Sequence, residues 1–142
     1  MIIGAVKEKK KFENRVSISP DDVKNYVKAG HQVFIEKGAG SLSGFNDKSY
    51  KESGATLSTS KEVLKNSDII LKINCPTPDE SKLIKNNSMV ISQISIQNNQ
   101  DSIKILNSKK ISAFALELVP RITRAQDMDC LLYTSDAADD WF

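Results

Sequence analysis

A regular alternation between short apolar runs and capped, amphipathic helices is the feature that most constrains the fold. Strand–helix alternation at this spacing produces βαβ units, in which helices join neighbouring parallel strands. The pattern therefore predicts an α/β fold: a Rossmann-like, mainly parallel sheet with helices on both faces. It leaves the strand order open. The expected strands lie at residues 2–6, 33–35, 55–57, 68–73, 89–94 and 111–116.

The expected helices carry recognisable start and stop signals. Ser19 followed by proline is typical of a helix N-terminus, and Gly30 is typical of the end of the same helix. Thr77 and Glu80 have the spacing of a capping box, again with proline at the first helical position, and open a helix that runs through residue 84. Shorter helices are expected at residues 48–52, from a Ser60 cap through residue 64, and at residues 101–106.

The composition agrees with one soluble globular domain. Of 142 residues, 39% are hydrophobic and 27% charged, with a net charge of +2. Lysine and arginine are spread along the chain without a basic block, so we expect neither nucleic-acid nor lipid binding. No apolar run approaches the roughly 20 residues of a membrane span, and the N-terminus lacks a signal-peptide pattern. Cys75 and Cys130 stand outside any metal-ligand spacing, which predicts free thiols and no metal site.

Two features that often mark catalytic or nucleotide sites are weak here. Gly38 and Gly40 follow a strand, but Ser43 stands where a dinucleotide fingerprint needs its third glycine. This loop is either a turn with close backbone packing or a weak phosphate cradle, and it is not the dinucleotide motif. His31 is the only histidine, and the sequence shows no partner that would make it a general base rather than a packed or solvent-facing residue.

Two polar loops are better candidates, because loops after the carboxyl ends of parallel strands line the ligand crevice of such folds. Arg15 follows the first expected strand, although a surface arginine or a helix-end ion pair would look the same. Residues 119–129 follow the last strand and offer two guanidinium groups, an amide and carboxylates. These groups suit ribose hydroxyls, a carboxamide and phosphates, whereas a charged loop leading into a capped helix is the structural alternative.

Several of these motifs, in this order, resemble the N-terminal domain shared by alanine dehydrogenase and the proton-translocating NAD(P) transhydrogenase α subunit. The resemblance covers residues 2–129 and implies that residues 1–129 form one domain of this type. The motifs that carry it are Glu-Asn-Arg-Val at 13–16, Ser-Pro at 19–20, Glu-Lys-Gly-Ala-Gly at 36–40, Ile-Leu-Lys-Ile-Asn at 70–74 and Val-Pro-Arg-Ile at 119–122.

Two positions favour the transhydrogenase branch. Asn74 stands where alanine dehydrogenases carry a lysine that holds the keto acid, and residues 93–96 contain no histidine where those enzymes carry a catalytic one. Arg121, Gln126 and Asp129 match the transhydrogenase loop that reaches over the nicotinamide end of NAD(H). Leu132 departs from that family, which has a serine at this position.

The resemblance implies an NAD(P) transhydrogenase as the parent enzyme. This chain would be the N-terminal portion of its NAD(H)-binding component, in which hydride passes from NADH to NADP⁺ with coupled proton translocation. NADP(H) would sit on a partner component. No catalytic acid or base is assigned, because direct hydride transfer needs positioning. The expected cofactor-binding residues are Arg121, Ile122, Thr123, Arg124, Gln126 and Asp129, with Arg15 and Lys72 in the same cleft.

The same resemblance implies a cytoplasmic homodimer, peripheral on the inner membrane, with NADP(H)-binding and membrane components as partners. Residues 130–142 contain no lysine or arginine, and we expect them to be a non-native tail. The segment alone is expected to be inactive and to bind NAD(H) poorly. Two alternatives remain: an amino-acid dehydrogenase of the alanine or saccharopine type, and a non-catalytic interaction domain.

Overall fold

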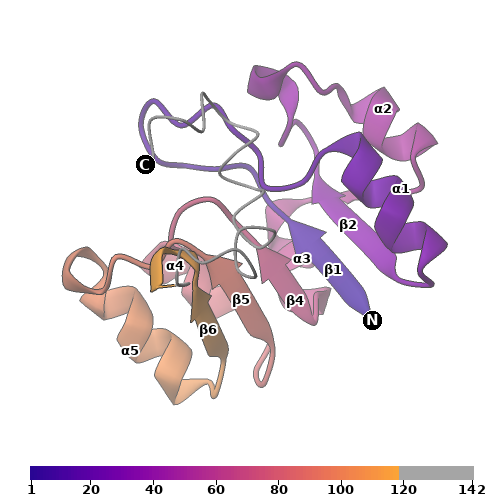
Figure 1. Ribbon diagram of the computed structural model, residues 1–142. Helices are drawn as coiled ribbons and strands as arrows, with labels where there is room; N and C mark the ends of the chain where they lie inside the picture. Colours follow the sequence, from indigo (N-terminus) through magenta and orange to yellow (C-terminus); the bar gives the residue numbers. More distant parts are fainter. Residues whose placement is uncertain (119–142) are drawn as a thin grey trace.

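The computed structural model describes residues 1–118, and six strands form its single sheet. They are β1 (Ile2–Ala5), β2 (Gln32–Glu36), β3 (Thr56–Ser58), β4 (Ile69–Leu71), β5 (Met89–Ser92) and β6 (Ser112–Ala115). Every paired strand is parallel, and the order across the sheet is β3-β2-β1-β4-β5-β6 (Figure 1). Strands β2 and β3 lie on one side of β1, and strands β4 to β6 lie on the other. The strand order therefore reverses between β1 and β4, and folds of this type bind their ligands at that point.

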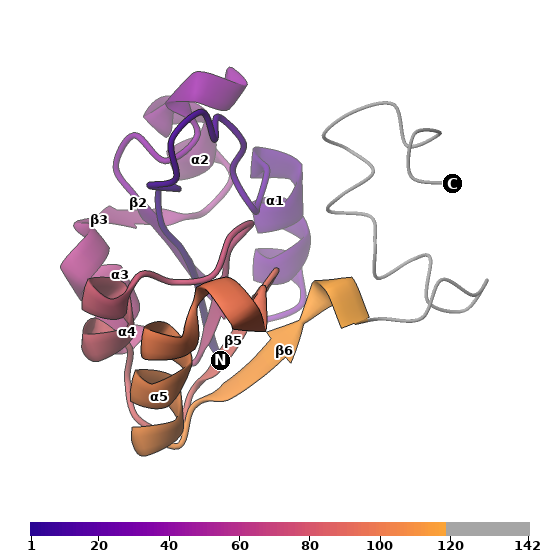
Figure 2. The ribbon, with the colours of Figure 1, turned by 90° about the vertical axis from the view of Figure 1, so that its left-hand side faces the viewer.

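Within residues 1–118, five helices cover both faces of the sheet, as the alternation predicted. They are α1 (Pro20–Lys28), α2 (Asp47–Glu52), α3 (Ser60–Asn66), α4 (Pro78–Leu83) and α5 (Gln100–Ser108). Helices α1 and α2 pack on one face, and α3, α4 and α5 pack on the other (Figure 2). Short 3₁₀ turns follow β2, β5 and β6 at Ser41–Ser43, Ile96–Asn98 and Leu116–Leu118. The prediction of a Rossmann-like α/β fold is confirmed.

Strand β1 contributes side chains to two separate hydrophobic cores, because successive side chains of a strand point to opposite faces of the sheet. Ile3 and Ala5 belong to the core under α1 and α2, whereas Val6 belongs to the core under the other three helices. Gly4 faces the second core, where an added Cβ would overlap the hydroxyl of Ser67. The absence of a side chain therefore lets the end of α3 pack directly on β1.

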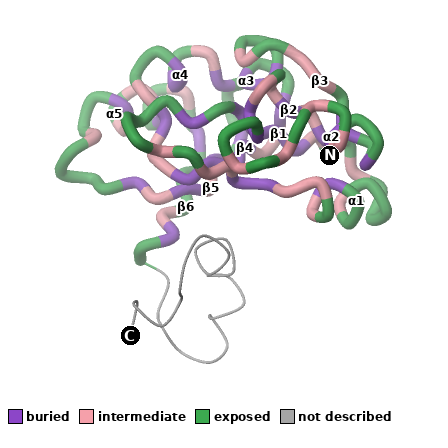
Figure 3. Tube along the Cα trace, turned by 90° about the horizontal axis from the view of Figure 1, so that it is seen from above, coloured by how far each residue is buried: buried purple, intermediate pink, exposed green. Residues whose placement is uncertain are grey.

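The two halves of the sheet differ in how well they are covered. Buried residues dominate the central strands β1 and β4, whereas the edge strands β3 and β6 contain no fully buried residue (Figure 3). On the face that α1 and α2 cover elsewhere, Met89 of β5 is 38% exposed and Phe114 of β6 is 42% exposed. The described residues thus complete the core around β1 and leave the β5–β6 half of this face open.

The expected element ends needed small corrections. Residues 68–73 were expected to form one strand, but β4 ends at Leu71, because the amides of Ile73 and Asn74 donate to the Glu8 carboxylate at 3.0 Å each. The strand expected at 89–94 likewise ends at Ser92. The cap of α3 is not Ser60 but Thr59, whose hydroxyl accepts a bond from an amide in the first turn, and the helix continues to Asn66.

Candidate functional site

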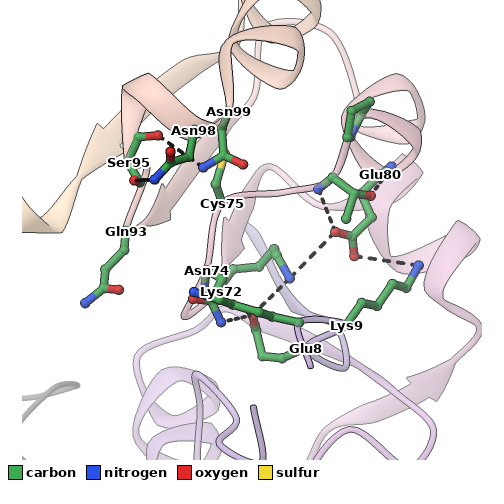
Figure 4. Close-up of a pocket in the computed structure, with 13 residues that line it drawn as sticks. Glu8, Lys9, Lys72, Asn74, Cys75, Glu80, Gln93, Ser95, Asn98 and Asn99 are labelled. Carbon is green, nitrogen blue, oxygen red and sulfur yellow. Dashed lines mark hydrogen bonds and ion pairs between the residues drawn. The ribbon is translucent and has the colours of Figure 1, made fainter. Parts of the chain in front are cut away.

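A cavity of about 560 Å³ opens at the carboxyl ends of the central strands (Figure 4). Its walls come from the loops that follow β1, β4 and β5 and from the first turn of α4. Parallel packing brings these loops together at one edge although they lie far apart in sequence. This is the crevice position at which doubly wound sheets bind their ligands.

Glu8 joins the loops after the two central strands. Its buried carboxylate accepts hydrogen bonds from the backbone amides of Ile73 and Asn74, from Lys72 Nζ at 3.2 Å, and more weakly from Asn74 Nδ2 at 3.4 Å. A carboxylate can accept this many donors because both oxygens carry two lone pairs. Glu8 therefore fixes the backbone after β4 in a defined position beside the cavity.

Lys72 directly follows β4 and is only 1% exposed. Its ammonium group is 3.2 Å from Glu8 Oε1 and 3.8 Å from Glu80 Oε1, and both carboxylate side chains are also 1% exposed (Figure 4). A buried charge is tolerated when it is paired and hydrogen-bonded. Lys9, which is half exposed, lies 3.8 Å from Glu80 Oε2 and completes the row of charges. The cation at position 72 is thus held inside an ion cluster.

Glu80 both caps helix α4 and pairs with Lys72. It closes a capping box with Thr77 at the start of α4, as the sequence predicted, through Thr77 N to Glu80 Oε1 at 3.0 Å. The same oxygen faces Lys72. Within residues 1–118, Glu80 Oε2 is buried and accepts no hydrogen bond. The helix cap therefore also positions a carboxylate next to the cavity.

Arg15 lies in the loop after β1, as expected, and pairs with Glu13. Nε and Nη2 of Arg15 donate to the two Glu13 oxygens at 2.8 and 2.9 Å, which is a bidentate arrangement. The hydrogen bonds from Arg15, with a further one from Asn74, lower the pKa of Glu13 to about 2 against the opposing effect of burial. Arg15 lines a neighbouring cavity of about 490 Å³, whereas Lys72 lines the first one. Asn74 lines the first cavity and is bonded to both Glu8 and Glu13.

The loop after β5 is fixed by a carboxylate in a similar way. Glu117, in the turn after β6, accepts the amides of Ile94 at 2.9 Å and Ser95 at 2.6 Å. Burial opposes ionisation of Glu117, but these amide bonds outweigh it and lower the pKa of the carboxyl group. Ser95 has a positive φ of 49°, which is uncommon for a residue with a side chain. The clamp holds this unusual backbone at the cavity rim.

Other candidates contribute little to the cavity chemistry. Cys75 lines it, but burial raises the pKa of this thiol to about 11, so it is protonated near neutral pH. His31 lies at the opposite edge of the sheet, just before β2. Gly40 packs so closely on Tyr50 that an added Cβ would come within 2.7 Å of the ring, which supports a closely packed turn for the glycine loop.

The sequence-predicted loop residues and the second thiol lie outside the described residues: Arg121, Ile122, Thr123, Arg124, Gln126, Asp129 and Cys130. Sequence reasoning did not single out Glu8 or Glu117. It noted Glu13 only within the Glu-Asn-Arg-Val motif and recognised Glu80 only as a capping residue. The available signal was position, since Glu8, Glu13 and Glu117 each follow an expected strand by a few residues. No helix in the first 118 residues combines the length and apolar character needed to cross a bilayer.

The family model and the related sequences identify the same protein family. The family model for "Alanine dehydrogenase/PNT, N-terminal domain" matches residues 4–138. The NAD(P) transhydrogenase subunit alpha of Haemophilus influenzae is 39% identical over 131 residues, which cover 92% of this chain and 25% of that protein. An alanine dehydrogenase of Methanococcus maripaludis is 39% identical over 126 residues, which cover 88% of this chain and 34% of that protein.

The fold comparison agrees with the sequence comparison. The solved transhydrogenase from Sinorhizobium meliloti superposes with a TM-score of 0.86 at 35% identity, covering 92% of this chain and 39% of that one. The chain therefore spans about a quarter to two fifths of the length of these relatives. With nearly its whole length matched in sequence and in fold, the chain belongs to the alanine dehydrogenase/PNT N-terminal domain family.

Proposed function

We propose that this chain is the N-terminal portion of the NAD(H)-binding component of a proton-translocating NAD(P) transhydrogenase. The observation that carries the proposal is the set of side chains around the cavity. Lys72 is held between two carboxylates, Cys75 is protonated, and the described residues at this edge include no histidine. Oxidation of an amino acid needs a group that takes up a proton, whereas hydride transfer between two nicotinamides needs accurate positioning.

In this proposal the residues after β6 orient the nicotinamide end of NAD(H). Arg121, Gln126 and Asp129 would supply the directed bonds, with Ile122, Thr123 and Arg124 completing the contact surface. Arg15 and Lys72 would border the nucleotide from two neighbouring cavities, in the loops after β1 and β4. NADP(H) would be carried by a second component, and a third would move the proton across the inner membrane. A cytoplasmic homodimer is part of the same proposal.

An alanine dehydrogenase-like activity is the second candidate. It is favoured by the 39% identity to the Methanococcus maripaludis enzyme, which equals the identity to the transhydrogenase relative. Asn74 argues against it, because an amide bonded to two carboxylates offers no positive charge to a keto acid.

A domain replacement separates the two candidates. Residues 1–129 of this chain would replace the matching segment of the Haemophilus influenzae subunit alpha, which supplies the remaining length of the protein. With that organism's other transhydrogenase components, we expect NADH-dependent reduction of NADP⁺ and no NADH oxidation with pyruvate and ammonium. Pyruvate- and ammonium-dependent oxidation would reverse the assignment. Loss of both activities with retained folding would favour a non-catalytic interaction domain.

We also propose that the family domain ends at residue 129. Residues 1–129 are proposed to form the family domain and residues 130–142 to be a non-native tail, although the family model matches through residue 138. Independent sequencing of the coding region from codon 115 tests this assignment. A different sequence after codon 129 is the expected result, and an unchanged one would make residues 130–142 a genuine part of the protein.

A further inference from the structure

Helix α5 begins without the side-chain cap that the other four helices within residues 1–118 have. In α1, α2, α3 and α4, an oxygen of the preceding side chain accepts a hydrogen bond from an amide in the first turn; these caps are Ser19, Asn46, Thr59 and Thr77. Asn99 holds the same position before α5. It instead donates through Nδ2 to the backbone carbonyl oxygens of Ile94 at 2.8 Å and Ser95 at 3.2 Å (Figure 4).

The first turn of α5 therefore presents backbone donors that have no acceptor in the described part of the chain. The amides of Gln100, Asp101 and Ser102 make no hydrogen bond within residues 1–118, whereas the next amide, of Ile103, donates to the carbonyl oxygen of Asn99 at 3.0 Å. Such amides and the helix dipole attract anions. Water satisfies the amides at many helix ends, so this feature alone does not define a site.

A buried hydroxyl group is the second and independent feature of this helix end. Ser102 is 1% exposed, yet its hydroxyl makes no hydrogen bond within residues 1–118. Every other buried serine in this part of the chain donates its hydroxyl to a backbone carbonyl oxygen: Ser17, Ser53, Ser67, Ser81, Ser88 and Ser92. Buried hydroxyl groups normally have a partner, because an unpaired one has lost its hydrogen bonds to water. The Ser102 hydroxyl thus remains available to a ligand.

Ser102 lines a cavity of about 360 Å³ whose walls are Pro78 and residues 97–102. This cavity adjoins the larger one of the candidate site, and Asn98 lies on the wall of both (Figure 4). The first turn of α5, however, lines only the smaller cavity. Among the described residues, no lysine or arginine lines it, and the exposed Asp101 is the one charged residue in its wall. The donors around this cavity are therefore amides and one hydroxyl.

We propose that the first turn of α5 and the Ser102 hydroxyl form a binding site for the phosphate group of a small molecule. A phosphate group has at least three terminal oxygens, which suit three consecutive amides and a hydroxyl better than the two coplanar oxygens of a carboxylate. Binding is weak, in the millimolar range, because no cation lines the cavity and the charge of Asp101 opposes an anion. The site does not depend on the proposed function.

A ¹H–¹⁵N titration of the ¹⁵N-labelled 142-residue chain with inorganic phosphate tests the site. We expect saturable shifts concentrated on the amides of Gln100, Asp101 and Ser102, and no comparable shifts in sodium chloride of equal ionic strength. Glycerol 3-phosphate distinguishes the sources of the group: tighter binding than inorganic phosphate assigns the site to a phosphate ester, and weaker binding assigns it to the free ion. Either order supports the site. No saturable shift at millimolar phosphate, or an equal response to chloride, would overturn the inference.

Ser102→Ala removes the proposed hydroxyl donor. We expect phosphate affinity to fall about tenfold, whereas the melting temperature should stay unchanged or rise, because the hydroxyl has no protein partner to lose. The matched control is Ser108→Ala at the other end of α5, where an exposed hydroxyl donates to the carbonyl oxygen of Ile105 at 2.7 Å. The control should bind phosphate like the parent chain. Unchanged phosphate affinity in Ser102→Ala, or a lower melting temperature, would contradict the assigned role of Ser102.

Asp101→Asn tests whether the ligand is an anion. The substitution removes a negative charge from the cavity wall, so we expect a severalfold increase in phosphate affinity that diminishes as salt is added. Asp21→Asn is the matched control, because Asp21 is exposed in the first turn of α1 on the other face of the sheet. It should leave phosphate affinity unchanged. No gain in Asp101→Asn, or the same gain in both variants, would overturn a specific phosphate site at α5.

Discussion

The two ion-pair systems at the carboxyl edge use similar chemistry in different surroundings. Lys72, Glu8 and Glu80 are each about 1% exposed at their side chains, whereas Arg15 is 35% exposed and its partner Glu13 is 10% exposed. Charges that have lost their water depend on their partners, and half-exposed charges can exchange a partner for solvent or ligand. We therefore regard the Lys72 cluster as part of the fold and the Arg15–Glu13 pair as part of the adjustable binding surface.

Removal of the buried cation should cause the largest loss of stability among the variants considered. Lys72→Met leaves Glu8 buried without a counter-charge and Glu80 with only the half-exposed Lys9, and breaking a buried ion pair in this way costs about 3–5 kcal/mol. We expect a decrease of that size in the free energy of unfolding measured with urea. The control Lys48→Met removes an exposed helix pair with Glu52 and should cost less than about 0.5 kcal/mol. Similar losses in the two variants would contradict a structural role for Lys72.

Glu8→Gln should have the next largest effect. Glutamine keeps one acceptor oxygen but loses the charge opposite Lys72, so we expect a loss of about 1–3 kcal/mol in urea unfolding. Hydrogen exchange of the Ile73 and Asn74 amides should accelerate more than exchange elsewhere in the sheet. Glu36→Gln is the matched control, because Glu36 accepts the Lys7 amide at an exposed position. Uniform acceleration across the sheet would mean that Glu8 does not clamp this loop specifically.

Arg15→Met should change stability by less than about 1 kcal/mol, as expected for a partly exposed pair. Its clearer effect is on Glu13. The native pKa of about 2 lies below the ordinary value of 4.5, so the pair stabilises the fold above pH 4.5 and loses this contribution as the pH falls toward 2. In the variant, NMR titration should show the pKa of Glu13 rising toward 4.5, with a flatter acid dependence of unfolding. A Glu13 pKa that stays near 2 would contradict the assigned cause.

The smallest effect is expected at Cys75, which lines the same cavity as the Lys72 cluster. Burial raises the pKa of its thiol to about 11, so little thiolate exists near neutral pH. In a Cys130→Ser background, alkylation at pH 8 should be slower than for a free cysteine and should increase steadily toward pH 11. Rapid modification at pH 7 would show that the cavity stabilises the thiolate.

The fold was predictable because its signals are local. The cap at Ser19 and the capping box at Thr77 mark helix starts within four residues, and apolar runs mark the strands. The site was less predictable because its key contacts join distant residues. Glu8 meets Lys72 across 64 positions, and Glu117 meets Ile94 across 23. Nothing in the local sequence pairs these residues; the strand order does, and that order emerged only with the structure.

Arg15 also shows that the sequence could predict the position of a site residue but not its contacts. Its position after the first strand indicated the crevice correctly, but the sequence left a surface arginine and an ion pair open. The structure shows the ion pair with Glu13, two residues away, and thereby links Arg15 to Asn74. The charge of Arg15 was readable from the sequence, whereas the cavity it lines depends on packing against the loop after β2.

Chemical-shift mapping of NADH on the ¹⁵N-labelled chain tests the central claim, that the carboxyl edge of the sheet receives the nicotinamide nucleotide. We expect weak binding with shifts concentrated in the loops after β1, β4 and β5, around Glu13, Asn74 and Ser95, and in residues 121–129. We expect no shifts at the opposite edge, around Gly30 and Asn87. Shifts centred on that opposite edge, or none at millimolar NADH, would contradict it.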